Sequence, residues 1–166
     1  MAVRRWMFHE LGGFDERLPI GWEDTEICWR AWLRGWRTVY TPSALCWHRV
    51  GADSAPSTIS WIRYRGALGG RLLFATKHMP FEDAALTWLH AVAGSILEAR
   101  AGELSLLRRR LSVLREFGAH VPKLLAERKS LYGRAGISPR EHLQRLATLQ
   151  AVDLQDAMEE LPAAHS

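Results

Sequence analysis

The spacing of turn-forming and apolar residues in the sequence changes near Pro80, and this change constrains the fold more than any other feature. Before Pro80, residues typical of turns recur at short intervals: Gly12, Gly13, Gly21, Gly35, Pro42, Gly51 and Pro56. After Pro80, apolar residues recur at three- and four-residue spacing, which predicts helices over 82–100, 103–117, 121–131 and 139–161. We therefore interpret residues 1–80 as a mixed α/β part and residues 81–166 as a helical extension.

Two helices are predicted in the first part. Apolar residues recur at helical spacing over 24–33, acidic residues open this segment, and Gly35 follows it as a C-terminal cap. Residues 57–78 indicate a second helix. Because glycine lowers helix stability, we expect this helix to be broken or frayed around Gly66, Gly69 and Gly70.

Two short strands are expected between these helices. Residues 36–41 and 44–48 lie on either side of Pro42 and have the composition typical of strands. The sequence pattern thus predicts an α/β fold class with short strands, followed by an all-helical tail.

The composition is that of a globular protein. Of the 166 residues, 48% are hydrophobic and 24% are charged, which excludes a disordered chain. Cys28 and Cys46 are too few for a disulfide framework, and we expect both as reduced thiols. No secretory signal follows Met1, and no apolar stretch reaches the roughly 20 residues of a membrane span. These features favour a cytoplasmic localisation.

Tryptophan and positive charge are concentrated in the first part. Seven of the eight tryptophans precede residue 62. Residues 1–80 hold 11 Lys and Arg against 7 Asp and Glu, a net charge of +4, whereas residues 81–166 hold 11 of each. Such a composition permits stacking on nucleic-acid bases. The charges form no stripe, however, and the tryptophans have the spacing of core residues, so we expect no nucleic acid as a partner.

Three short segments of the first part carry side chains suited to catalysis or binding. Residues 12–16, Gly-Gly-Phe-Asp-Glu, form a tight loop with two carboxylates. Residues 22–24, Trp-Glu-Asp, place two carboxylates at the start of a helix, and residues 47–49, Trp-His-Arg, end a strand with groups able to bind a metal ion or a phosphate. Each also has a structural explanation, since carboxylates often cap helices and a lone histidine is usually no ligand. Arg30 and Arg34, four positions apart, fit a solvated helix face.

The order and spacing of these segments resemble the C-terminal part of the catalytic domain of family 2 glycosyltransferases, and of rhamnosyltransferase-like members in particular. The matching residues are Arg5, Phe8, Gly12-Gly13-Phe14-Asp15-Glu16, Trp22-Glu23-Asp24-Thr25-Glu26-Ile27-Cys28-Trp29-Arg30, Gly35, Val39-Tyr40-Thr41-Pro42-Ser43-Ala44 and His48. The resemblance implies that residues 1–80 are the C-terminal half of a GT-A fold, a Rossmann-like α/β domain, to which residues 81–166 are appended.

The resemblance implies site residues near the acceptor and the donor sugar. Asp24, the second residue of the Glu-Asp pair, resembles the base that deprotonates the acceptor hydroxyl in inverting enzymes, and Glu23 resembles its supporting partner. Trp22 is expected to form an apolar wall of the substrate site. The Gly12-Gly13-Phe14 loop is expected to lie beside the donor sugar and the acceptor, with Asp15 as the direct contact.

The resemblance also implies residues near the donor phosphates. His48 resembles the ligand that, together with an Asp-x-Asp motif, holds a divalent cation on the pyrophosphate in some family members, and Arg49 is expected beside the same phosphates. The implied cofactor is Mn2+ or Mg2+, with its carboxylate ligands supplied from outside this chain, since the sequence has no Asp-x-Asp. Gly69-Gly70 stand where relatives commonly carry Arg-Asn.

The implied function is transfer, with inversion, of a hexose or deoxyhexose from a nucleotide diphosphate sugar to a hydroxyl of a glycan or lipid-linked acceptor, as in cell-wall polysaccharide biosynthesis. The nucleotide-binding half that precedes this segment in relatives is expected upstream or as a separate chain. The alternative is a catalytically silent, truncated remnant that keeps only acceptor or partner binding.

The helical extension carries one basic segment. Residues 106–111, Leu-Leu-Arg-Arg-Arg-Leu, suggest peripheral contact with an anionic membrane surface, at the inner face of the membrane. The alternative is a helical bundle that packs on the first part and leaves the arginines solvated. Glu98, Glu103 and Glu116 favour this alternative because they dilute the basic face.

Overall fold

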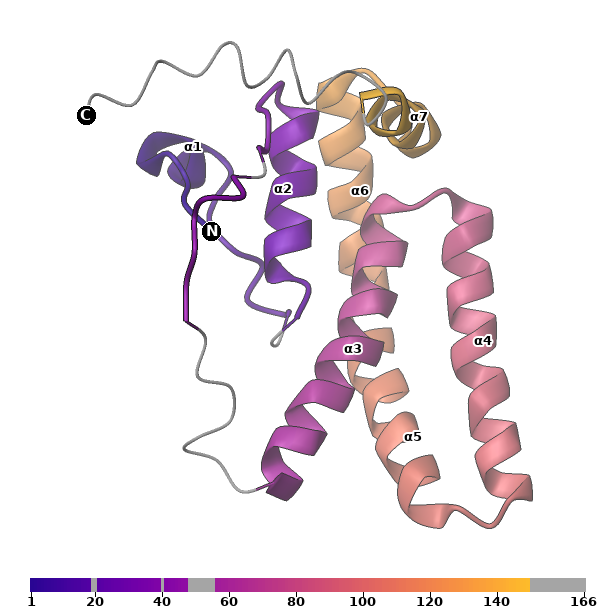
Figure 1. Cartoon of the computed structure of the whole chain (residues 1–166). Coiled ribbons are helices and arrows are strands. Elements are labelled where there is room, and N and C mark those ends of the chain that lie inside the picture. The colour runs from indigo at the N-terminus through magenta and orange to yellow at the C-terminus, as the bar shows by residue number, and fades with distance from the viewer. Residues whose placement is uncertain (19–20, 40, 48–55, 150–166) are drawn as a thin grey trace.

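The computed structural model describes residues 1–18, 21–39, 41–47 and 56–149, without the side chains of 56–60 and 149. The described residues form helices joined by turns and extended segments (Figure 1). The helices are α1 (Arg5–Glu10), α2 (Glu23–Leu33), α3 (Pro56–His78), α4 (Phe81–Arg100), α5 (Leu104–Gly118), α6 (Val121–Ala135) and α7 (Pro139–Leu149).

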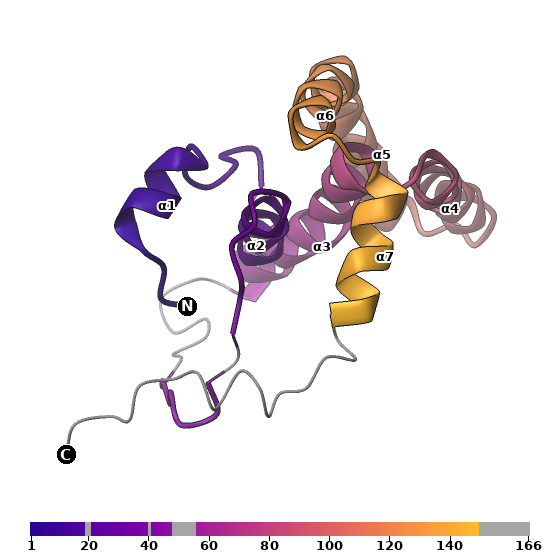
Figure 2. The same ribbon diagram turned by 90° about the horizontal axis from the view of Figure 1, so that it is seen from above.

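α3 is the central helix. It packs against α4, α5 and α6, while α2 lies along another side of it (Figures 1 and 2). Leu18, from the loop before α2, joins a buried core that α3, α4, α5 and α6 supply with Leu72, Leu73, Ala91, Val113, Phe117 and Leu124. The core therefore combines residues from before and after Pro80.

The predicted α/β fold class is wrong for the described part of the chain, which contains no strand and hence no sheet of a GT-A half-domain. Residues 36–39, 41 and 44–47 belong to the two predicted strands but are unpaired; Tyr40 and His48 lie outside the described residues. A strand needs a neighbouring strand to satisfy its backbone N–H and C=O groups. No other described segment pairs with this one, so its strand-like composition produces only an exposed, extended connection.

The predicted helices are confirmed with small shifts at their ends. α2, α4, α5 and α6 begin and end within a few residues of the predicted bounds. α7 begins at Pro139 as predicted, and the predicted continuation beyond residue 149 lies outside the described residues. α1 was not predicted, because its six residues are too few to show a helical period.

α3 runs without a break through Gly66, Gly69 and Gly70, contrary to the expectation of a broken helix. Two of these glycines leave room for aromatic rings because they lack a Cβ atom. A Cβ atom on Gly69 would overlap the ring of Phe117, and one on Gly70 would overlap the ring of Trp22. Burial of these rings against the α3 backbone offsets the conformational cost of glycine in a helix, which is about 1 kcal/mol per residue.

Candidate functional site

A group of charged side chains is enclosed by the loop before α2 and by helices α2, α3 and α6. Lys77 lies at its centre, with Nζ 2.9 Å from Oδ2 of Asp15 and 2.7 Å from Oε1 of Glu26. Buried charges are tolerated only when they are paired, and three cations here face three carboxylates. We call this group the buried charge cluster; its members are Asp15, Arg17, Glu26, Arg30, Lys77 and Glu127.

Arg17 joins the loop before α2 to α6. Its Nε and Nη2 donate to the two carboxylate oxygens of Asp15 at 2.7 and 2.5 Å, and its Nη1 and Nη2 donate to those of Glu127 at 3.1 and 2.6 Å. Such paired hydrogen bonds fix geometry more strongly than a single contact does. The Gly-Gly-Phe-Asp-Glu loop is thereby attached to a helix more than a hundred residues further along the chain.

Arg30 joins α2 to the same loop. It lies one helical turn after Glu26, and its Nε and Nη2 donate to the Glu26 carboxylate at 2.8 and 2.6 Å. Its Nη1 and Nη2 also donate to the backbone carbonyls of Leu11 and Gly13, at 2.5 and 2.7 Å. Gly12 and Gly13 have φ values of +78° and +76°, which favour glycine, so this turn explains both residues. Arg30 is therefore buried, not part of a solvated helix face.

His78 is fully buried beside the cluster. Its Nε2 lies 3.2 Å from Oε1 of Glu26, and its Nδ1 lies 3.3 Å from the hydroxyl of Tyr132, which accepts a hydrogen bond from Nε1 of Trp29 at 2.8 Å. Burial lowers the pKa of His78 to about 4, although the neighbouring Glu26 carboxylate opposes this shift. The imidazole is therefore neutral at pH 7.

The two central carboxylates remain ionised. Burial by itself would raise the pKa of Glu26, but hydrogen bonds from His78 and Arg30 and the charge of Lys77 lower it to about 2. Burial acts in the same direction on Asp15, where Arg17 and Lys77 outweigh it and hold the pKa well below its ordinary value. Carboxylates with such low pKa values are weak bases. The cluster is thus suited to holding four segments together rather than to proton transfer.

The predicted Glu-Asp pair occupies the first turn of α2. Oε2 of Glu23 accepts the backbone N–H groups of Gly21 and Trp22 at 2.5 and 2.9 Å, so this carboxylate closes the turn before the helix. Asp24 is exposed, and its Oδ1 accepts hydrogen bonds from the backbone N–H and the hydroxyl of Thr25, at 2.7 and 3.3 Å. Asp24 forms no ion pair with any residue that the structure describes.

The other predicted site residues divide between the interior and the surface. Trp22 packs on α3, with its ring 5.2 Å from that of Phe74. Phe14 is 42% exposed and lies edge-on to Phe8. Asp15 belongs to the buried charge cluster and Asp24 contacts Thr25, so the structure does not bring these two carboxylates together.

His48 and Arg49, the residues expected near the donor phosphates, lie outside the described residues. Across the described ranges, no group of three or more His, Cys, Asp or Glu side chains is placed to hold a metal ion together. None of the described helices combines the length and the apolar character needed to cross a membrane.

Sequence reasoning missed Lys77, His78 and Tyr132. The i, i+4 spacing of Glu26 and Arg30 indicates an ion pair, but it carries no information about burial. The carboxylate partners of Lys77 lie 62 and 51 positions earlier in the chain. Only the tertiary packing of α2 on α3 brings them together, so no local pattern reveals them.

Comparison with known proteins found a similarity to a rhamnosyltransferase. Over 88 residues the chain is 31% identical to N-acetylglucosaminyl-diphospho-decaprenol L-rhamnosyltransferase from two strains of Mycobacterium tuberculosis; this region covers 53% of the chain and 28% of each relative. The chain thus spans less than a third of the length of these curated relatives. No family model matches the chain, and no solved structure matches it. Over just over half of its length, the chain is therefore similar to a glycosyltransferase.

Proposed function

We propose that this chain forms the acceptor-side part of an inverting glycosyltransferase. It would act in transferring a hexose or deoxyhexose from a nucleotide diphosphate sugar to a hydroxyl of a glycan or lipid-linked acceptor. The observation that carries the proposal is the similarity over 88 residues to a rhamnosyltransferase whose name specifies a lipid diphosphate acceptor. The structure supports the proposal with a second observation, the exposed carboxylate of Asp24.

The position of Asp24 suits a catalytic base. Glu26, two residues later in the same helical turn, is held by Arg30 and Lys77 inside the buried charge cluster. The first turn of α2 is therefore anchored from within, while the Asp24 carboxylate faces solvent. A base must be both positioned and accessible to the proton that it removes, and Asp24 meets both requirements.

In the proposed reaction, Asp24 accepts the proton of the acceptor hydroxyl. The acceptor oxygen forms a bond to the anomeric carbon of the donor sugar from one face, and the bond from that carbon to the diphosphate oxygen breaks on the other face. The nucleotide diphosphate leaves with the electron pair, and the configuration at the anomeric carbon inverts. The negative charge on Asp24 is neutralised by the proton it receives.

The remaining proposed roles belong to substrate binding. Glu23 supports Asp24 by closing the turn before α2, Trp22 offers aromatic surface at the start of this helix, and Phe14 offers it beside α1. The roles of His48 as a ligand of Mn2+ or Mg2+ and of Arg49 beside the diphosphate rest on the resemblance alone, and we assign no step to a cation.

The test is sugar transfer by the chain expressed together with the coding sequence immediately upstream of it. Asp24→Asn should lower the turnover of nucleotide diphosphate sugar by 100-fold or more, because general-base catalysis contributes about 10²–10⁴-fold. Asp83→Asn is the matched control, since Asp83 is also an exposed carboxylate in the first turn of a helix, α4. Equal turnover in both variants contradicts the role of Asp24, and absence of turnover in the unmodified protein favours the silent remnant.

A further inference from the structure

The α4–α5 hairpin presents a broad apolar face that no other described residue covers. α4 lies at the edge of the bundle, where α3 and α5 contact its inner side (Figures 1 and 2). Its outer side is apolar over about three turns, from Leu86 to Leu97: Leu89 is 59% exposed and Ile96 is 53% exposed. The remaining large apolar side chains of this outer side are Leu86, Val92 and Leu97. Exposed apolar patches of this kind mark interaction surfaces.

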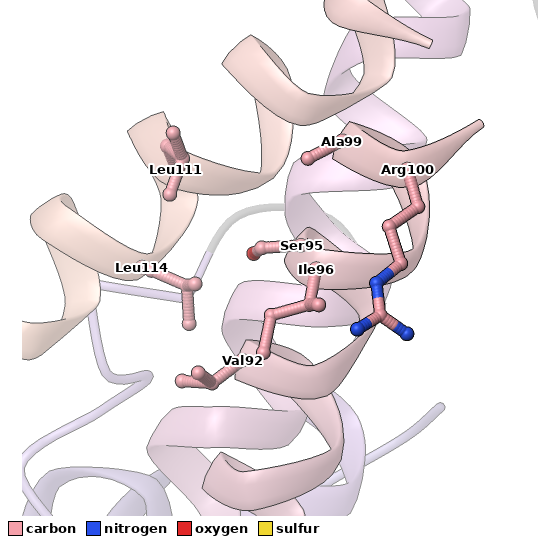
Figure 3. Close-up of a pocket in the computed structure, with 7 residues that line it drawn as sticks. All are labelled: Val92, Ser95, Ile96, Ala99, Arg100, Leu111 and Leu114. Carbon is pink, nitrogen blue, oxygen red and sulfur yellow. The ribbon is translucent and has the colours of Figure 1, made fainter. Parts of the chain in front are cut away.

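The apolar face continues from α4 onto α5. An open groove between the two helices is lined by Val92, Ser95, Ile96, Ala99 and Arg100 of α4 and by Leu111 and Leu114 of α5 (Figure 3). Leu111 is itself 49% exposed. The two helices therefore form a single apolar surface, which we call the hairpin face.

Three of the five acidic side chains of the hairpin form ion pairs, whereas Asp83 and Glu103 are exposed and form none with any described residue. Glu98 pairs with Arg110 at 2.7 Å across the hairpin, and Glu116 pairs with Arg65 of α3. The sequence suggested that Glu98, Glu103 and Glu116 dilute the basic segment. The structure assigns Glu98 and Glu116 to ion pairs within the bundle and leaves Glu103 exposed. Residues 81–118 hold five acidic and five basic side chains, so the charge of the hairpin face depends on where they lie, not on the total.

Three of the four hairpin arginines that form no ion pair with a described residue lie at the hairpin face. Arg100 borders the groove. Arg108 and Arg115 lie three residues before and four residues after Leu111, so they share its side of α5. Within the described part of the chain, none of these three arginines forms an ion pair. The hairpin face thus combines apolar side chains with a cluster of free positive charges.

We propose that the hairpin face docks on the surface of an anionic phospholipid bilayer. Apolar side chains of α4 and Leu111 would enter the boundary between headgroups and acyl chains, while the arginines would bind lipid phosphates. A second copy of the chain fits this face less well, because a two-fold contact pairs the face with itself and would enclose six arginines in one apolar interface. The proposal goes beyond sugar transfer and holds whether or not Asp24 is a base.

Vesicle flotation of the full chain tests the proposed binding of the arginines to lipid phosphates. The chain should bind vesicles of phosphatidylcholine with phosphatidylglycerol, and should bind pure phosphatidylcholine more weakly. The triple variant Arg100→Gln, Arg108→Gln, Arg115→Gln should lose roughly 100-fold in partition coefficient, given the contribution of each basic residue at an anionic surface. The matched control is Lys123→Gln, Lys129→Gln, Arg134→Gln, which removes the same charge from exposed positions of α6 and should retain binding.

A second pair of variants tests the apolar part. Leu89→Ser with Ile96→Ser should abolish binding to anionic vesicles, whereas Leu125→Ser, on the surface of α6, should not; circular dichroism verifies that all variants keep their helices. Three results overturn the proposal: no binding by the unmodified chain, equal losses in the hairpin and α6 triple variants, or a dimer in light scattering that Leu89→Ser with Ile96→Ser dissociates. The last result would identify a second copy as the occupant.

Discussion

At the residue scale, the stability of the interior depends on charges that neutralise one another. Lys77 reaches two carboxylates from different parts of the chain, Asp15 in the loop and Glu26 in α2. Each carboxylate also has an arginine, so the loss of Lys77 would leave three buried or half-buried acidic groups facing two cations. A buried charge that loses its partner destabilises a fold more than a neutral cavity of the same size does.

Replacement of Lys77 is therefore expected to be severe. Lys77→Met keeps the length of the side chain but removes its charge, and should lower the free energy of unfolding by about 3 kcal/mol or more. Urea denaturation followed by circular dichroism measures this change. Lys123→Met, at an exposed position of α6, is the control and should change the stability by less than about 0.5 kcal/mol. Similar effects of both substitutions would show that the Lys77 contacts do not stabilise the protein.

At the element scale, α3 is an example of glycines that preserve a helix instead of breaking it. Gly69 admits Phe117 of α5, and Gly70 admits Trp22 from the start of α2. The Gly-Gly pair that replaces Arg-Asn in the resemblance therefore has a packing function here. Its two residues let α2 and α5 approach different sides of the same helix.

Alanine usually stabilises a helix relative to glycine, but at these two positions it should destabilise the protein. Gly69→Ala and Gly70→Ala should each lower the free energy of unfolding by about 1–3 kcal/mol, because the added methyl group displaces an aromatic ring. Gly133→Ala in α6, where a Cβ atom meets nothing within 4 Å, should raise it by up to about 1 kcal/mol. Thermal and urea denaturation measure all three.

A double-mutant cycle identifies the cause. Combining Gly69→Ala with Phe117→Leu should cost less than the sum of the two single substitutions, because the smaller side chain leaves room for the methyl group. Strict additivity would mean that the ring of Phe117 does not contact Gly69.

At the scale of the whole molecule, the buried ionisable groups couple folding to pH. His78 has a pKa of about 4 in the fold and 6.5 as its ordinary value. Between these pH values the unfolded chain binds a proton that the native protein does not, so stability falls as the pH is lowered from about 6.5. Below pH 4.5, Glu26 adds to the loss, because its pKa falls from 4.5 to about 2 on folding.

Denaturation across this pH range should show both steps. The free energy of unfolding is expected to fall by on the order of 3 kcal/mol between pH 7 and pH 4 and to fall further below pH 4. His78→Gln should reduce the dependence between pH 6.5 and 4.5, leaving the contribution of His142, whose pKa burial also lowers, and should keep the loss at lower pH. His90→Gln, at an exposed position of α4, should leave both steps in place. A flat profile in the unmodified protein would contradict the burial of His78 as a neutral group.

The helices of the second part could be predicted from the sequence because their apolar residues repeat along a single segment. The strands at 36–41 and 44–48 could not, because a strand depends on a partner elsewhere in the chain, and the described residues supply none. The residues of the candidate site also divide into those that a local pattern predicts and those that depend on distant contacts. Asp24 at the start of a helix is visible in the local pattern, whereas the involvement of Asp15 with Lys77 is not.

The sequence by itself determined the helical periods, the turn at Gly12 and Gly13, and the motif order that resembles a glycosyltransferase, because each depends on residues close together in the chain. Only the tertiary structure decided which charges are buried and which remain free. It placed Arg30 and Lys77 in the interior, turned Glu98 and Glu116 into the bundle, and left Asp24 and the arginines of the hairpin face exposed. Burial and pairing are properties of contacts between distant segments, and such contacts exist only once the helices have packed.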